Sequence, residues 1–306
     1  MKITVIGASG SVGAPTVFYL AANRLADEFL MIGGTRQNLL QQHAIDISTA
    51  VSSRDVIIRT GDYIDMAGSD IVINAAGAPQ GLIADRMEML PKNVELIKQI
   101  SGKIKQYCPD AIVITATNPV DPLNYAMWLS GGFDRKKLIG YSINDSFRFR
   151  EMLAKAYNVR VSQVDGIVIG EHGSTQVYLF STARVNGEKI GVSEDIKIKI
   201  RSEIPNILKR LEELQSGRTA GWTCAIGLEK IVRAIIEDSE DVFPCSVVLD
   251  GEYGVNRISM SVPVRLGKKG VREILEYRLA PDEAEGLKKT VAVLEKAAKI
   301  VDENIS

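Results

Sequence analysis

The chain has 306 residues, of which 45% are hydrophobic and 25% charged, and its formal net charge is −1. This length is enough for two hydrophobic cores, and the composition is that of an ordinary globular protein. A charge so close to neutral argues against nucleic acid or an anionic membrane surface as a partner. No apolar run approaches the roughly 18 residues of a membrane span. We therefore expect small molecules and further copies of the chain as partners.

Cysteine usage and the first residues both favour a cytoplasmic location. Cys108, Cys224 and Cys245 lie far apart and lack metal-ligand spacing, so we predict no metal site and no disulfide framework. Cys224 and Cys245 have apolar neighbours and are expected to fill space in the core. A strand-like run follows Met1-Lys2 directly, which leaves no room for a signal peptide.

The first half of the chain alternates short β-branched runs with helical patterns, which is typical of an α/β fold with a doubly wound parallel sheet. Several runs are apolar on successive residues, as expected for strands buried on both faces. The predicted strands are Ile3–Ile6, Phe29–Ile32, Val56–Thr60, Ile71–Asn74, Ala111–Thr115 and Leu138–Ile139. Helical patterns lie between them, notably at Gly13–Asn23 and Pro91–Tyr107. A further apolar helix, around Ala44–Ile47, either faces this sheet or contributes to an interface between copies.

The pattern changes after about residue 141, which predicts two closely packed domains, residues 1–141 and residues 142–306. The second is expected to be an α+β domain. Its predicted elements are a helix at Asp145–Tyr157, a strand pair at Gly166–Ile169 and Gln176–Arg184, helices at Glu194–Gln215 and Thr219–Glu237, a hairpin of Val247–Leu249 and Ile258–Val264 around Gly251 and Gly254, and a last helix starting at Pro281. Proline in the first turn and the acids after it favour that helix start.

A glycine-rich loop follows the first predicted strand and precedes a helix. Its sequence is Gly7-Ala8-Ser9-Gly10-Ser11-Val12-Gly13. Glycine lets the backbone turn tightly and approach a pyrophosphate, and the helix start offers N–H groups and a positive dipole to that anion. The loop therefore predicts a Rossmann dinucleotide-binding domain. The cofactor contacts we expect in it are Gly7, Ser9, Gly10, Ser11, Val12 and Gly13.

The end of the second strand bears on the choice between NADP and NAD. The strand runs into Gly33-Gly34-Thr35-Arg36, with no acid to bind the hydroxyls of the adenosine ribose. A carboxylate would repel a 2′-phosphate, whereas Arg36 and the Thr35 hydroxyl can bind one. We predict NADP in preference to NAD, with contacts at Gly34, Thr35 and Arg36. The alternative is that Arg36 is an ordinary surface arginine and the site accepts either cofactor.

His172 is the candidate acid–base residue. It is one of two histidines and lies in a turn-like segment, Gly170-Glu171-His172-Gly173, just after a strand. Asp145 and Arg148, at positions i and i+3 of one predicted helix, project from the same face. The aspartate can fix the histidine tautomer, and the arginine can hold a substrate carboxylate. As a lone pair, Asp145 and Arg148 would more often form an ordinary helix salt bridge.

With these motifs in place, the chain resembles the L-lactate/malate dehydrogenase family nearly end to end. The resemblance depends on the glycine loop, Ala75-Ala76-Gly77-Ala78-Pro79, Thr117-Asn118-Pro119-Val120-Asp121, Asp145-Ser146-Phe147-Arg148 and Gly170-Glu171-His172-Gly173, in this order. It implies reversible hydride transfer between a nicotinamide and C2 of a 2-oxo or 2-hydroxy acid. It also implies a homodimer or homotetramer.

The resemblance assigns roles to individual residues. His172 would donate and accept the proton, Asp145 would orient it and Arg148 would anchor the substrate carboxylate. Arg86 would polarise the substrate carbonyl from a closing loop, and Asn118 would bind near the substrate oxygen and the nicotinamide. The Asn118–Pro119 bond is expected to be cis. Cofactor contacts are further implied at Ala76, Gly77, Thr117 and Asn118.

The chain departs from the malate pattern at two substrate-binding positions. Gln80 stands where malate enzymes carry a second arginine, and malate's second carboxylate beside it would lack a counter-charge, at a cost of several kcal/mol. Trp222 occupies a wall position that is threonine in lactate enzymes and small in malate enzymes; alternatively it turns into the core. Arg218, four residues before it, is either a compensating cation or a surface arginine. We therefore expect inefficient turnover of malate.

Two other interpretations compete with the dehydrogenase. A short-chain reductase or epimerase needs a Tyr-x-x-x-Lys pair, and none of the nine tyrosines has lysine four residues later. A non-catalytic dinucleotide sensor on the same fold would bind cofactor without oxidising it. The joint presence of Asp145, Arg148, His172, Arg86 and Asn118 argues against the sensor.

Overall fold

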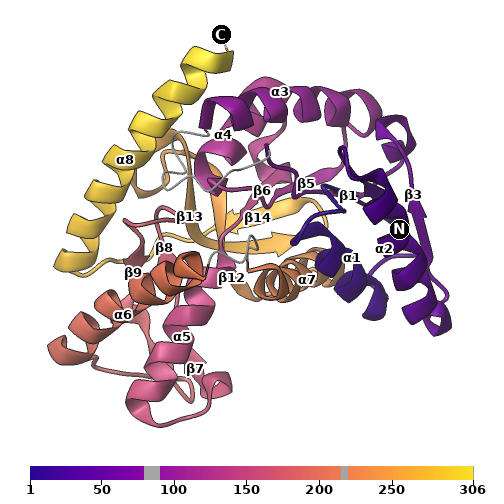
Figure 1. Ribbon diagram of the computed structural model, residues 1–306. Helices are drawn as coiled ribbons and strands as arrows, with labels where there is room; N and C mark the ends of the chain where they lie inside the picture. The colour runs from indigo at the N-terminus through magenta and orange to yellow at the C-terminus, as the bar shows by residue number, and fades with distance from the viewer. Residues whose placement is uncertain (79–89, 215–219, 306) are drawn as a thin grey trace.

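The computed structural model describes residues 1–78, 90–214 and 220–305. Across these residues one sheet of nine strands forms the centre of the molecule, in the order β14-β13-β12-β6-β5-β4-β1-β2-β3. Helices cover both of its faces, with α3 and α4 on one side and α1 and α7 on the other (Figure 1).

The first half of the chain forms the parallel part of this sheet. Its strands are β1 (Lys2–Ile6), β2 (Glu28–Ile32), β3 (Ile57–Thr60), β4 (Ile71–Asn74), β5 (Ile112–Thr115) and β6 (Leu138–Tyr141), and its helices are α1 (Gly13–Ala22), α2 (Gln37–Ala50), α3 (Leu90–Tyr107) and α4 (Val120–Gly131). The predicted doubly wound sheet is confirmed, with strand ends displaced by at most two residues. The order reverses between β1 and β4, so the loops that follow these strands flank a crevice, the usual dinucleotide site.

The sheet does not end with the first half. Strand β12 (Val242–Asp250) pairs antiparallel with β6, through Cys245 opposite Tyr141 and Ser246 opposite Gly140. β13 (Asn256–Gly267) and β14 (Gly270–Ile274) extend it further. The predicted hairpin around Gly251 and Gly254 is therefore present and longer than expected, but it continues the parallel sheet. Pairing across some hundred residues has no local sequence signal.

The remaining part of the second half forms a smaller second core. It contains α5 (Ile143–Tyr157), α6 (Glu194–Glu213) and the two-residue strands β7 (Val164–Asp165), β8 (Val168–Ile169), β9 (Val177–Tyr178), β10 (Arg184–Val185) and β11 (Glu188–Lys189). The prediction of one strand pair here was wrong in extent. β8 pairs with β9, but a 3-10 turn at Phe180–Thr182 interrupts the second strand. Phe180 points into this core, edge-on to Phe149 at 5.1 Å, and β10 pairs with β7 and β11 instead.

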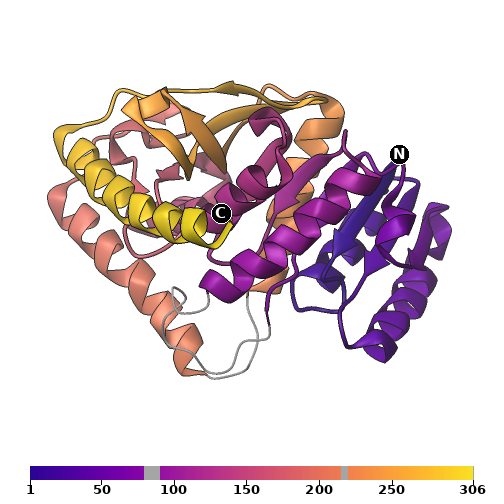
Figure 2. The ribbon, with the colours of Figure 1, turned by 90° about the horizontal axis from the view of Figure 1, so that it is seen from above.

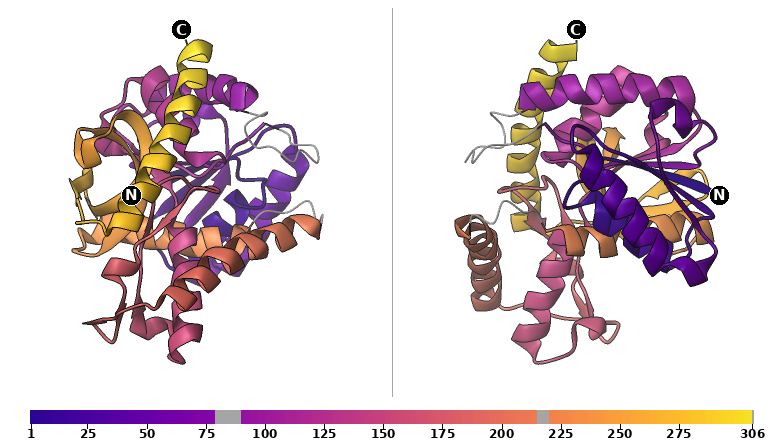
Figure 3. Two further views of the ribbon diagram at one scale, coloured as in Figure 1. Left: turned by 90° about the vertical axis from the view of Figure 1, so that its left-hand side faces the viewer. Right: turned by 45° about the vertical axis from the view of Figure 1, so that its right-hand side comes forward.

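Two long helices complete the chain. α7 (Gly221–Glu237) lies beside α1, and α8 (Pro281–Ile305) begins at the predicted proline and crosses α3 and α4 (Figures 2 and 3). The buried Glu283 carboxylate accepts hydrogen bonds from the N–H groups of Ser181 and Ala280 and so fixes the start of α8. No helix in the described part of the chain is long and apolar enough to cross a membrane.

Candidate active site

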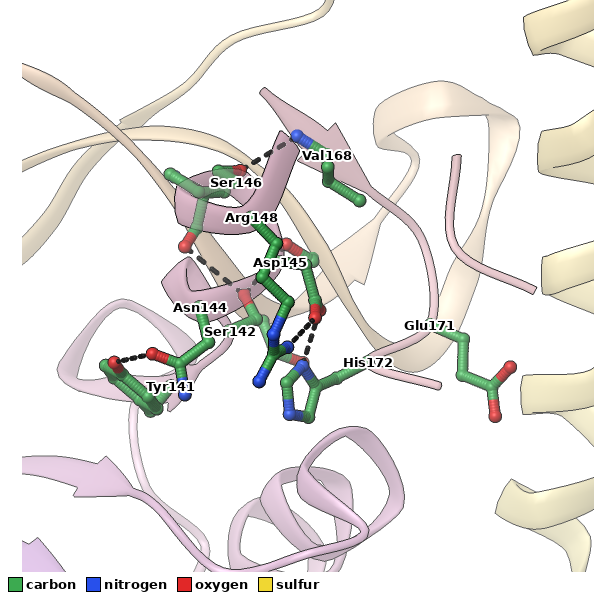
Figure 4. Close-up of polar contacts among 12 residues, drawn as sticks. Tyr141, Ser142, Asn144, Asp145, Ser146, Arg148, Val168, Glu171 and His172 are labelled. Atoms are coloured by element: carbon green, nitrogen blue, oxygen red, sulfur yellow. Dashed lines mark hydrogen bonds and ion pairs between the residues drawn. The ribbon is translucent and has the colours of Figure 1, made fainter. Parts of the chain in front are cut away.

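Three predicted residues meet at the junction of α5 and the segment after β8 (Figure 4). The Asp145 carboxylate divides its oxygens between two partners: Oδ2 lies 2.6 Å from His172 Nδ1, and Oδ1 accepts a 3.0 Å hydrogen bond from Arg148 Nη1. Their side chains are only 12% (His172), 7% (Asp145) and 15% (Arg148) exposed. A charge network this buried is costly to break, at about 3–5 kcal/mol when one partner is removed.

The spacing on α5 explains why Asp145 and Arg148 act together. The helix begins at Ile143, so both lie in its first two turns and three residues apart place them on one face. Because Asp145 holds Nδ1 of the imidazole, proton exchange with a substrate falls to Nε2. The arginine guanidinium lies beside the same ring (Figure 4). This arrangement can hold an anionic substrate next to a proton donor.

The backbone of His172 is fixed separately from its ring. Gly170 exchanges two backbone hydrogen bonds with Ser261 of β13, of 2.8 and 3.0 Å. The His172 N–H then donates to Asp121 Oδ2 at 2.6 Å, while Glu171 points away from the ring (Figure 4). In the sequence, Asp121 stands out only as the last residue of the motif Thr117-Asn118-Pro119-Val120-Asp121. The sequence feature that could have drawn attention to Asp121 is an acidic residue in the first turn of an otherwise apolar helix.

A second polar cluster that the sequence did not reveal joins α5 to α7. The Tyr141 hydroxyl donates to Asn144 Oδ1 at 2.6 Å and reaches the Thr223 carbonyl at 3.1 Å. Asn144 Nδ2 in turn donates to Cys224 Sγ at 3.3 Å, so the thiol is a hydrogen-bond acceptor as well as core filler. Burial raises the pKa of the Cys224 thiol, which keeps it protonated. The cluster fixes the first turn of α7 against the helix that carries Asp145.

The predicted cofactor loop lies at the carboxyl end of β1. Gly7 has φ +83°, and a Cβ there would approach the Ala76 backbone nitrogen to 2.6 Å, so only glycine lets the loops after β1 and β4 touch. The N–H groups of Gly7 and Ala8 donate to the Ile32 carbonyl at the end of β2. The first turn of α1, which follows, contains no acid. This cradle and the helix start fit a dinucleotide phosphate.

The predicted contacts beyond the loop lie along the same edge of the sheet. Thr117 Oγ1 donates to the Ala76 carbonyl at 2.7 Å, its methyl lies beside Gly77, and the Asn118–Pro119 bond is cis as expected. Gly34, Thr35 and Arg36 follow β2 and are exposed. Within the residues described, Arg36 forms no ion pair, so its guanidinium faces solvent at the predicted ribose end.

The structure describes only some of the residues predicted to line the substrate pocket. Gln80, Arg86 and Arg218 lie outside the described residues. Trp222 is 72% exposed in the first turn of α7, so the alternative that it turns into the core was wrong. The neighbouring Gly221 explains its place: a Cβ there would lie 1.8 Å from the Ser11 carbonyl oxygen, so α7 starts directly against the glycine loop. Trp222 thus follows directly on a residue that packs against the predicted cofactor loop.

Comparison with known proteins places both halves of the chain in one family. Residues 1–140 match the lactate/malate dehydrogenase NAD binding domain, and residues 144–304 match the lactate/malate dehydrogenase alpha/beta C-terminal domain. The malate dehydrogenase of Halobacterium salinarum is 36% identical over 288 residues, covering 92% of this chain and 93% of that protein. L-lactate dehydrogenase 1 of Clostridium acetobutylicum is 32% identical over 307 residues, covering 97% of each.

A solved structure extends the likeness to three dimensions. The lactate dehydrogenase of Cryptosporidium parvum, complexed with lactic acid and β-nicotinamide adenine dinucleotide, superposes with a TM-score of 0.92 at 30% identity and covers 98% of both chains. Fold and site thus define an NAD-dependent oxidoreductase that acts on the CH–OH group of a hydroxy acid. With its two matches spanning nearly the whole chain, the protein belongs to the lactate/malate dehydrogenase family.

Proposed function

We propose that His172 is the acid–base residue of a reversible 2-oxo acid reduction, with Asp145 orienting it and Arg148 holding the substrate carboxylate. The observation that carries the proposal is the Asp145 carboxylate, bonded at once to His172 Nδ1 and Arg148 Nη1. The Asp145 carboxylate thereby orients both the proton donor, His172, and the residue that would bind the substrate carboxylate, Arg148. Asn118 and, from outside the described residues, Arg86 would contact the reacting oxygen.

The reduction transfers one hydride and one proton to the 2-oxo acid. When bound, the reduced dinucleotide would supply the hydride to C2 of the 2-oxo acid. His172 Nε2 gives its proton to the carbonyl oxygen, which becomes the hydroxyl, and the ring is left neutral. Asp145 favours the protonated imidazole before the step, and Arg148 neutralises the carboxylate that lies next to the reacting carbon. In the reverse direction the neutral ring removes the hydroxyl proton.

For the substrate, we propose a 2-oxo acid with an uncharged side chain over oxaloacetate. Gln80 offers no cation to a second carboxylate, and Trp222, 72% exposed at the start of α7, offers apolar surface next to Gly221, which packs against the glycine loop. The competing hypothesis is that Arg218 supplies the missing cation. Replacing Arg218 with alanine would then cripple turnover of a dicarboxylate and spare pyruvate, whereas equal losses on both would dispose of the hypothesis.

For the cofactor, we propose a preference for NADP over NAD. The support is the absence of a carboxylate after β2, together with the exposed Thr35 hydroxyl and Arg36 guanidinium. A 2′-phosphate would gain charge-assisted hydrogen bonds there, whereas the ribose hydroxyls of NAD would gain no acid partner.

We further propose a homodimer or homotetramer in the cytoplasm, built from domains of residues 1–141 and 142–306. On α2, Ala44 and Ile47 are buried against the protein's own core, while Ile45 is 68% exposed. The helix thus faces its own sheet and still offers one apolar side chain outward. Sedimentation of the purified protein would measure the state of association.

A steady-state assay tests the proposed function. The protein is incubated with NADPH or NADH and a panel of pyruvate, oxaloacetate and bulkier 2-oxo acids, and kcat/KM is compared across the panel. A tenfold preference corresponds to about 1.4 kcal/mol of transition-state discrimination. A hundredfold preference for oxaloacetate would refute the substrate proposal. Cofactor binding without oxidation of NADPH or NADH by any member would indicate a sensor.

A further inference from the structure

Asp121 is a buried carboxylate that the proposed reaction does not use. It lies in the first turn of α4, and 1% of the residue is exposed. Oδ2 accepts the 2.6 Å hydrogen bond from the His172 N–H, and Oδ1 accepts a 2.6 Å hydrogen bond from the Ser246 hydroxyl. Among the described residues no lysine or arginine forms an ion pair with it. Burial of a carboxylate this deep costs free energy, so the side chain is expected to have a structural or functional role.

The surroundings of Asp121 connect three parts of the site. The carboxylate follows Asn118 by three residues, so it sits at the base of the segment predicted to contact the nicotinamide. Ser246 belongs to β12 and is bonded to Ser259 of β13 at 2.9 Å, and Asn124 of α4 donates to both strands. Through Asp121, the His172 backbone is therefore tied to α4 and to the antiparallel end of the sheet. The helix start also favours a negative charge here.

We propose that Asp121 is a positioning residue for the acid–base step: its ionised carboxylate holds the main chain of His172 so that Asp145 can align the ring, and protonation of Asp121 releases that hold. This inference rests on the proposed role of His172. It gives His172 two carboxylate partners: Asp121 acts on its backbone and Asp145 on its ring.

The electrostatics of the site support a protonation step in an accessible range. Burial raises the pKa of Asp121 to about 6, although the Ser246 hydroxyl, the His172 N–H and the charge of His172 each lower it. Glu171 is the acidic side chain that raises it further. From β12 the uncharged Ser246 contacts Asp121, and Ser246 is bonded in turn to the uncharged Ser259 of β13. The carboxylate is thus ionised at neutral pH and becomes protonated on mild acidification.

The direction of the reaction separates Asp121 from His172. Reduction of a 2-oxo acid needs protonated His172, so kcat/KM falls on the alkaline side when the imidazole loses its proton. Lowering the pH keeps His172 protonated, and the substrate carboxylate stays ionised well below pH 6. With NADH as the cofactor, which carries no 2′-phosphate to titrate near pH 6, we assign a loss of kcat/KM on the acid side to Asp121.

The experiment compares pH profiles of kcat/KM for 2-oxo acid reduction. The parent should show an acid limb with a midpoint near pH 6. Asp121→Asn keeps the shape but is uncharged at every pH. It should therefore lose the acid limb and show, at all pH values, the lowered kcat/KM that the parent shows when Asp121 is protonated. Ser246→Ala removes a donor that lowers the pKa of Asp121, so its acid limb should move to higher pH. Ser130→Ala, which removes a different hydroxyl from α4, should leave the profile unchanged.

The outcomes are distinguishable. An acid limb that is the same in the parent, Asp121→Asn and Ser246→Ala would overturn the positioning role. If Asp121→Asn does not fold, the direction of the Ser246→Ala shift decides alone. The alkaline limb tests His172 independently. Its absence, or full activity of a His172→Gln variant, would remove the proposed function itself, whereas failure of the Asp121 prediction with the alkaline limb intact would leave that function standing.

Discussion

The cofactor end and the catalytic end of this site are built from different parts of the chain, backbone at one end and charged side chains at the other. At the cofactor end the contacts are made by backbone, and what matters is the absence of a side chain, as at Gly7 against Ala76. At the catalytic end partly buried charged side chains are bonded to one another, as in His172, Asp145 and Arg148. The comparison teaches that added volume should damage the first end, whereas a changed charge should damage the second.

Removal of the imidazole should give the largest effect and separate the two ends. A His172→Gln variant is expected to lose roughly 1,000-fold in kcat/KM, because general acid–base catalysis contributes about 10²–10⁴-fold. Binding of the reduced cofactor, followed by its fluorescence, should be unchanged, since the glycine loop is intact. A loss below tenfold would contradict the assignment of His172.

Substituting the substrate anchor tests the same end through geometry and not charge. Arg148→Lys keeps the cation but loses the planar fork, so kcat/KM should fall by about 100-fold, mostly through KM. Lys155→Ala on the same helix breaks only an exposed pair with Glu151 and serves as the control. If both variants behave like the parent, Arg148 does not bind the substrate carboxylate.

These two ends were not equally visible in the sequence. The glycine loop and the Asp145–Arg148 spacing are local patterns, and the alternation of strands and helices predicted the doubly wound sheet, though not its antiparallel continuation. His172 was singled out by its turn after a strand, and the resemblance then assigned it the acid–base role. The bond between Asp121 and His172 spans 51 residues, and the link between Tyr141 and Thr223 spans 82. Such contacts form only when the sheet brings distant segments together, so no local spacing in the sequence predicts them.

The contact between α7 and the glycine loop is where volume should matter most. Gly221→Ala would place a methyl group 1.8 Å from the Ser11 carbonyl oxygen, so the backbone must shift. We expect the free energy of unfolding to fall by about 1–3 kcal/mol and KM for the cofactor to rise. Gly191→Ala, at a position with no heavy atom within 4 Å of the new Cβ, is the matched control in denaturant titrations. Equal stability of the two variants would mean that α7 does not hold this loop.

The smallest effect should come from Arg36, a charged side chain at the predicted cofactor end. Arg36→Ala removes a solvent-facing guanidinium after β2, so a charge-assisted hydrogen bond to a 2′-phosphate would be lost and the ratio of kcat/KM with NADPH to that with NADH should fall about tenfold. The activity with NADH should not change, because its ribose carries no phosphate for Arg36 to bind. Arg54→Ala removes an equally exposed positive charge from the same half of the chain and controls for long-range attraction of the phosphate. An unchanged ratio in Arg36→Ala would mean that Arg36 does not bind a 2′-phosphate, and the preference for NADP would have to be abandoned. The same fall in both variants would mean that the ratio reflects long-range attraction of the phosphate and not a contact with Arg36.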